Sequence, residues 1–272
     1  PKEQASSPLP EQNMNLTAGF GKLGMWALGK WGNLLDTGPL RRTMQERMKL
    51  DEAKIAASER TLLINTTQVS TGQNVIFSNR PIFRRSTNQP RPDVVPGITL
   101  SRILASCSIP MVYPWTRDAQ TGGVYWDGAL VANTPLGAAL DAAADRPAED
   151  VMEAVVVMMT PWHRGDEPAQ ELPLPKDLGE AITYALDWML LSSFRESLAL
   201  LEAFNRLAEV GRQMNDSLLS RYRTVSCTIV APQQFFSAAR ILDYDARNAQ
   251  HIEMGCQAAE RAFLQAYPFQ QG

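Results

Sequence analysis

Short apolar runs that alternate with longer amphipathic stretches restrict most strongly how this chain can fold. Thr61–Val69 and Asn74–Ser78 are rich in β-branched residues and flank a short polar turn, which predicts a β-hairpin. Glu153–Thr160 and Val225–Val230 are apolar at nearly every position, and a proline follows each run within two residues. Runs that are apolar on both faces are typical of parallel strands buried between layers of helices.

Three stretches carry helical signals, and they span Pro39–Ile55, Pro135–Ala144 and Asp177–Val210. In the third stretch a capping box precedes apolar residues that recur at spacings of three and four. This pattern weakens at Ser192–Ser193, so it fits either two helices or one bent helix, with Gly211 as the stop.

The alternation of these elements predicts an α/β protein with three layers, in which helices cover both faces of one largely parallel sheet. We expect Thr61–Val69, Glu153–Thr160 and Val225–Val230 to be strands of that same sheet. Because the three runs need cover on both faces, a separate sheet for any of them would contradict this expectation.

A Pro-rich stretch divides the sequence into two parts. Pro161–Pro175 is the best linker in the chain, because prolines and polar residues interrupt every apolar pattern there. We expect a strand-bearing part at residues 1–161 and a mainly helical part with one further strand at residues 162–272.

The charge balance argues against several classes of function. The 272 residues contain 26 Lys and Arg against 29 Asp and Glu, with a net charge of -3 and no basic block. A nucleic-acid site needs a concentrated positive field, so we expect no nucleic-acid partner. The three cysteines lie far apart, which fits neither a disulfide framework nor zinc-ligand spacing and suggests buried thiols in a reducing compartment. Two histidines are too few for a metal site. No uncharged apolar run reaches the roughly 18 residues of a membrane span.

A glycine pattern near the start of the chain has two interpretations. Gly19–Gly24 matches G-x-G-x-x-G, which forms a nucleotide or oxyanion loop when it follows an apolar strand. Here it follows polar residues, which favours a flexible or helix-packing glycine segment. Trp26 and Trp31 stand nearby at near-helical spacing, which is typical of core residues and also fits a membrane interface.

The most informative pattern surrounds Asp127. Val124–Trp126 predicts an aromatic strand that ends at this aspartate, and Gly128 and Ala129 follow it directly. Asn133-Thr134-Pro135 then supplies a helix start with proline in the first turn. Such a strand end aims one carboxylate at a cleft, whereas an ordinary Asp-Gly turn is the alternative interpretation.

Four ordered segments of the sequence resemble the patatin-like phospholipase family. Asp127–Ala129 with Asn133–Pro135 is similar to the family's Asp-Gly-Gly/Ala motif. Leu34–Leu40 resembles its Leu-Leu-Asp-Thr-Ser-Pro-Leu segment, and Thr61–Ser78 resembles its strand, turn and strand with a Thr-Gly-x-x-Val-x-Phe core. Ile103–Pro114 resembles its Ala-Ser-x-Ala-x-Pro-x-x-Phe-Pro segment. Four motifs in the right order are far more specific than any one of them.

This resemblance implies a patatin-like α/β/α fold that is incomplete at the N-terminus, with residues 1–161 as the C-terminal portion of the phospholipase domain and a helical extension after it. It also implies a lipid or acyl-ester substrate, no cofactor, and a Ser-Asp dyad in which Asp127 accepts the serine proton. Gly128 would let the serine-bearing loop approach closely, Ala129 completes the motif, and Asn133 would fix the Asp loop by side-chain hydrogen bonds.

The nucleophile half of the family's pattern is absent from the sequence. No serine has glycines at both minus two and plus two, and Gly19–Gly24 is not the family's oxyanion loop, which precedes the nucleophile. The resemblance places Ser106 and Ser108 in a structural segment that we expect to line the acyl pocket. The first residues lack an initiating Met and a signal peptide, so we expect an internal piece of a longer protein whose upstream serine is the nucleophile.

Two other interpretations stay open. A non-catalytic descendant would keep the fold and a lipid groove as a binding or interaction module, and an unrelated α/β protein would match all four motifs by chance. The pairs Arg41-Arg42 and Arg84-Arg85 fit either lipid phosphate or a solvated face. We expect a cytoplasmic protein with peripheral contact to a membrane surface.

Overall fold

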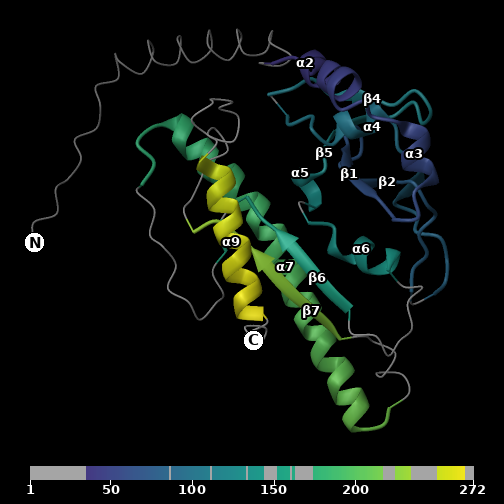
Figure 1. Ribbon diagram of the computed structural model, residues 1–272, viewed down its shortest axis with the longest axis vertical. Coiled ribbons are helices and arrows are strands. Elements are labelled where there is room, and N and C mark those ends of the chain that lie inside the picture. The colour runs from purple at the N-terminus through teal and green to yellow at the C-terminus, as the bar shows by residue number, and fades with distance from the viewer. Residues whose placement is uncertain are drawn as a thin grey trace, which may run out of the picture.

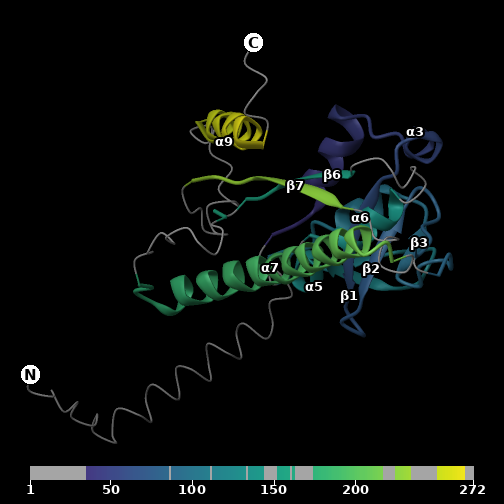
Figure 2. The ribbon, with the colours of Figure 1, turned by 90° about the horizontal axis from the view of Figure 1, so that it is seen from below.

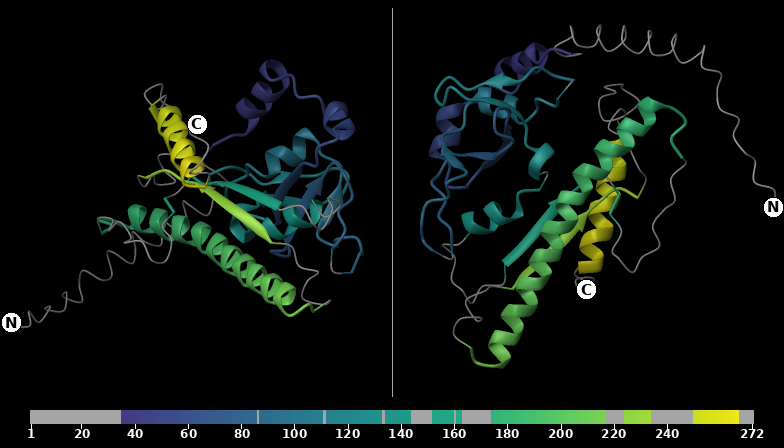
Figure 3. Two further views of the ribbon diagram at one scale, coloured as in Figure 1. Left: turned by 60° about the horizontal axis from the view of Figure 1, so that its bottom comes forward. Right: turned by 180° about the vertical axis from the view of Figure 1, so that it is seen from behind.

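The computed structural model describes residues 35–85, 87–110, 112–132, 134–143, 152–159, 161–162, 174–216, 224–233 and 250–266. These residues form two groups of elements that lie side by side (Figures 1 and 3). One group holds a sheet of five strands with several short helices, and the other holds two strands with two long helices.

The five-stranded sheet has the order β3-β2-β1-β5-β4. Its strands are β1 (Leu63–Gln68), β2 (Asn74–Ser78), β3 (Val94–Pro96), β4 (Thr116–Arg117) and β5 (Val124–Asp127). The predicted hairpin is confirmed, because β1 pairs antiparallel with β2 from Leu63 opposite Ser78 to Thr67 opposite Asn74. Gly72 lies in its turn at a φ of 67°, a conformation that glycine adopts without steric cost.

The expected largely parallel sheet is wrong for this group of strands. β1 is antiparallel to β2 and to β5, β4 is antiparallel to β5, and only β3 runs parallel to β2. Tight turns join β1 to β2 and β4 to β5, and two strands joined by a tight turn can pair only in the antiparallel direction. The apolar pattern showed which segments are strands but carried no information on their direction.

The helices of this group are short. They are α2 (Gly38–Arg42), the π-helix η1 (Thr43–Arg47), α3 (Glu52–Ala57), α4 (Leu100–Ala105), α5 (Ala129–Ala132) and α6 (Leu136–Ala142). The predicted helix at Pro135–Ala144 is confirmed as α6. The predicted helix at Pro39–Ile55 is interrupted, because Lys49 adopts a φ of 49° and Asp51 caps a new helix by accepting hydrogen bonds from the backbone N–H groups of Ala53 and Lys54.

The second group is built on two parallel strands, β6 (Met152–Val157) and β7 (Val225–Val230). Helix α7 (Leu178–Gln213) covers one face of this pair and α9 (Gln250–Ala266) covers the other, as Figure 2 shows. The expectation that these strands share a sheet with β1 is wrong, since β1 is already paired along both edges and β6 pairs with β7. The cover on both faces that the apolar runs predicted is only partial, because Val155 and Val157 on one face of β6 stay 47% and 75% exposed.

Helix α7 is one continuous helix of 36 residues. The predicted cap is present, because the backbone N–H of Glu180 donates to Asp177 Oδ1 over 2.9 Å. The helix does not break at Ser192–Ser193, since Leu191 and Phe194 on either side of it pack against Val156 and Met158 of the β6 segment. Tertiary packing therefore overrides the weak local pattern. The linker Pro161–Pro175 lies largely outside the described residues, and the division at residue 161 stays a prediction.

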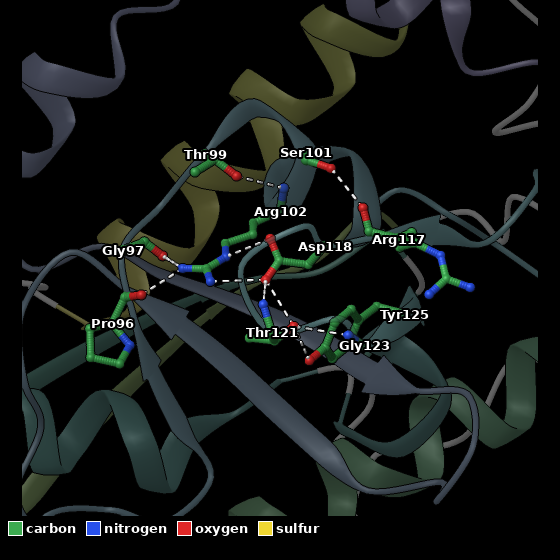
Figure 4. A network of polar contacts seen from close by, with 10 residues as sticks. All are labelled: Pro96, Gly97, Thr99, Ser101, Arg102, Arg117, Asp118, Thr121, Gly123 and Tyr125. Atoms are coloured by element: carbon green, nitrogen blue, oxygen red, sulfur yellow. Dashed lines mark hydrogen bonds and ion pairs between the residues drawn. The ribbon is translucent and has the colours of Figure 1, made fainter.

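A buried ion pair holds the five-stranded sheet to α4 (Figure 4). Arg102 is 1% exposed, and its Nε and Nη2 donate to the two carboxylate oxygens of Asp118 over 3.2 and 3.0 Å. Its Nη1 donates to the backbone oxygens of Pro96 and Gly97, and its guanidinium lies 4.4 Å from the ring centre of Phe77. Every N–H-bearing nitrogen of this buried cation therefore has a partner.

Arg102→Met should lower the free energy of unfolding of the chain by about 3–5 kcal/mol, because it leaves the Asp118 carboxylate buried without its cation. Urea denaturation measures the change. The double variant Arg102→Met/Asp118→Asn should regain part of the loss, since it removes the unpaired charge. A double variant that is less stable than Arg102→Met would contradict this account.

Candidate active site

Asp127 is the last residue of β5, and its backbone is fixed on both sides. Its N–H donates to the backbone oxygen of Ser108 over 3.0 Å, and its carbonyl accepts a hydrogen bond of 3.0 Å from Thr67 Oγ1 of β1. Thr66 of β1 is its partner in the sheet register. The position of the side chain is thus set by a strand neighbour and by the loop that follows α4.

The carboxylate of Asp127 has one engaged and one open oxygen. Oδ1 accepts a hydrogen bond of 2.9 Å from the backbone N–H of Ala129, whereas Oδ2 has no hydrogen-bond partner among the described residues. Burial raises the pKa of Asp127, and the hydrogen bond from Ala129 offsets only part of that rise. This is the environment of a carboxylate that takes up a proton more readily than an exposed aspartate does.

Gly128 allows the turn after Asp127 to press against β1. A Cβ at this position would lie 2.5 Å from the backbone carbon of Asn65 and 2.6 Å from its oxygen, which is closer than real Cβ contacts come. Any larger residue would have to push the turn away from the strand. The structure thus shows a close approach of the chain's own β1 to Gly128, and the expected approach of a serine-bearing loop stays a prediction.

The side chain of Asn65 holds the same turn, and the sequence analysis missed it. Its Nδ2 donates to the backbone oxygens of Gly128 over 3.2 Å and of Ala132 over 2.5 Å, so that the ends of α5 are both tied to β1. Its Oδ1 is buried without a partner among the described residues. An asparagine inside a β-branched run is unusual, because asparagine is depleted in strands, and this signal could have pointed to it.

The loop after α4 also contacts Asp127. Ser108 is fully buried, and its Oγ donates to the backbone oxygen of Leu104 over 2.9 Å and lies 2.9 Å from Thr116 Oγ1. It is therefore a structural residue. Burial and then the nearby Asp127 carboxylate raise the pKa of the Cys107 thiol, which keeps this half-buried side chain protonated and a poor nucleophile at neutral pH.

Several residues that the sequence pointed to lie outside the described residues. These are Asn133, whose support of the Asp loop stays a prediction, and also Gly19–Gly24, Trp26, Trp31 and His163. His251 lies on α9, which packs on β7 in the second group of elements. Within the described residues no cluster of three or more His, Cys, Asp or Glu could hold a metal ion.

Three cavities of the described structure are not lined by Asp127. Two of them, of about 740 and 620 Å³, lie beside Trp162 and β7, one against α9 and the other against α7. The chemistry of the Asp127 carboxylate, rather than cavity volume, marks it as the candidate site. None of the described helices is long and apolar enough to cross a membrane.

Comparison with known proteins finds one family over part of the chain. Residues 12–140 match the family model described as patatin-like phospholipase, and no curated protein matches the chain. The matched range contains β1 to β5, Asn65, Asp127 and Gly128, whereas α7, α9 and the β6–β7 pair lie beyond it. Residues 12–140 are thus similar to a patatin-like phospholipase domain, and that family comprises carboxylic ester hydrolases that act on lipids.

Proposed function

We propose that this chain is the base-bearing portion of a lipid acyl hydrolase in which Asp127 accepts the proton of a serine nucleophile. The observation that carries the proposal is the Asp127 carboxylate, which combines a raised pKa with an oxygen that has no described partner. No serine of the sequence lies in a G-x-S-x-G pattern, so the proposal assigns the nucleophile to a segment upstream of residue 1.

The proposed reaction has two steps that use the same carboxylate. The serine oxygen attacks the ester carbonyl while its proton moves to Asp127 Oδ2, and the tetrahedral intermediate collapses when Asp127 returns that proton to the leaving alcohol. Water then attacks the carbonyl carbon of the acyl-serine while one of its protons moves to Asp127. Asp127 passes that proton to the serine oxygen as the second tetrahedral intermediate collapses and the free acid is released. Each step begins and ends with Asp127 ionised.

The surroundings of Asp127 suit this role. An aspartate with its ordinary pKa is a weak base toward a serine hydroxyl, and burial makes it a stronger one. The hydrogen bond from the Ala129 N–H holds the carboxylate, and the hydrogen bonds from Asn65 Nδ2 hold the turn after it. Neither interaction occupies Oδ2 of Asp127. A positioned base that keeps one open oxygen is what a serine needs within hydrogen-bond distance.

Asp127→Asn should lower esterase turnover by about 10²–10⁴-fold in the protein made from its natural reading frame with the upstream serine, because it removes the proton acceptor but keeps the side-chain shape. Hydrolysis of a p-nitrophenyl acyl ester measures the loss. Asp36→Asn is the matched control, since Asp36 is exposed and has no assigned chemistry. Near-wild-type turnover of Asp127→Asn, or a complete protein without esterase activity, would favour the lipid-binding module instead.

The raised pKa of Asp127 also predicts a pH-dependent stability difference. The folded state holds the Asp127 proton more tightly than the unfolded chain does. The contribution of Asp127 to the free energy of unfolding of the wild type therefore falls as the pH rises from the ordinary aspartate pKa of 3.8 through the higher pKa of the folded state. Asp127→Asn lacks this loss and should be at least as stable as wild type at pH 7. Melting temperatures of both proteins across pH 3–7 check this, and a variant that is less stable than wild type at pH 7 would contradict it.

Gly128→Ala should lower turnover at least about tenfold and cost about 1–3 kcal/mol of stability, because its Cβ collides with the Asn65 backbone and displaces the Asp127 turn. Gly137→Ala is the matched control, since the same methyl group on α6 meets no atom within 4 Å. Esterase kinetics and urea denaturation measure both effects. Equal behaviour of the two variants would show that the close approach to β1 does not position the base.

A further inference from the structure

A basic arm with an apolar stripe projects from the five-stranded group. We define the basic arm as residues 35–49, which comprise α2, η1 and their flanking residues, and neither helix contains a buried residue. Leu40 is 37% exposed and Met48 is 66% exposed, and Met44 between them is half-buried. Residues four apart share one face of a helix, so these three side chains form a single stripe.

Four cations flank this stripe. Arg41, Arg42, Arg47 and Lys49 are all exposed, and none of them forms an ion pair with a described residue. The basic arm also contains two acidic residues, Asp36 and Glu46, so its four cations leave it a formal charge of +2. The whole chain, by contrast, carries a net charge of -3. Such a local excess of positive charge calls for a partner with negative charge.

The basic arm is also attached to the loop that holds Asp127. The N–H of Leu35 donates to the backbone oxygen of Val112 over 2.8 Å, and the oxygen of Ser108 in the same loop accepts the N–H of Asp127. Trp115, three residues after Val112, is 55% exposed. An indole ring of this kind is typical of the interface between water and lipid.

We propose that the basic arm is a contact surface for an anionic lipid bilayer, with Leu40, Met44 and Met48 facing the acyl chains and the arginines facing the headgroup phosphates. An amphipathic helix with basic residues beside an apolar stripe binds such a surface both by burying the apolar side chains and by attracting the anionic headgroups. A nucleic acid would satisfy the cations but leave the apolar stripe in water. The surface is independent of ester hydrolysis, and it brings lipid to the loop that positions Asp127.

Cosedimentation of the 272-residue chain with vesicles tests the proposal. The chain should bind vesicles of phosphatidylglycerol and phosphatidylcholine and bind pure phosphatidylcholine weakly. Each basic residue near an anionic bilayer contributes roughly fivefold to partitioning, so Arg41→Gln/Arg42→Gln/Arg47→Gln should lower binding about a hundredfold. Salt at 1 M, where the screening length is about 3 Å, should lower wild-type binding as well. Leu40→Ser/Met48→Ser should weaken binding but keep its salt dependence.

Controls separate the basic arm from net charge and from catalysis. Lys54→Gln/Arg60→Gln/Arg84→Gln removes the same charge from exposed positions outside the arm and should bind like wild type. Vesicle binding is measured without any ester hydrolysis, so failed hydrolysis and failed binding are distinguishable. The proposal is overturned if the arm variants keep full binding, if the charge-matched control loses as much, or if neutral vesicles bind equally well.

Discussion

The buried pair of Arg102 and Asp118 is the interaction on which the sheet around the site depends. It joins α4 to the segment after β3 and to the turn between β4 and β5. Removing a cation of this kind leaves a desolvated carboxylate with no partner, so the arrangement has little freedom to rearrange. The same turn reaches β5, because Thr121 Oγ1 contacts Asp118 and lies 3.0 Å from the hydroxyl of Tyr125.

This network sets where Asp127 lies. Tyr125 is buried and its ring contacts that of Phe77 at a centre distance of 5.2 Å, which fixes β5 two residues before the aspartate. Beyond Asp127 the turn is fixed by Asn65, whose amide holds both ends of α5. The candidate base is therefore placed by rigid elements on both sides rather than by a free loop, and this is what a positioned proton acceptor requires.

Two aspartates near the same strand have opposite electrostatic settings. Burial would raise the pKa of Asp118, but hydrogen bonds from Arg102 and Thr121 outweigh it and hold that pKa below its ordinary value. Asp127 is also buried, yet it receives one hydrogen bond from Ala129 and no cation among the described residues, so its pKa is raised. The first carboxylate stabilises the fold, and the second is kept in a state that favours proton uptake.

Local chemistry determined much of what the sequence alone could predict. The hairpin at β1 and β2, the Asp177 cap of α7 and the strand that ends at Asp127 each depend on neighbours within a few residues. Only the tertiary structure decided that β6 and β7 stand apart from β1, because an apolar run shows that a strand will be buried but not which strand it will meet. The same holds for Asn65, which reaches Gly128 across 63 positions of sequence. Contacts between distant segments are decided by packing, and no local pattern records them.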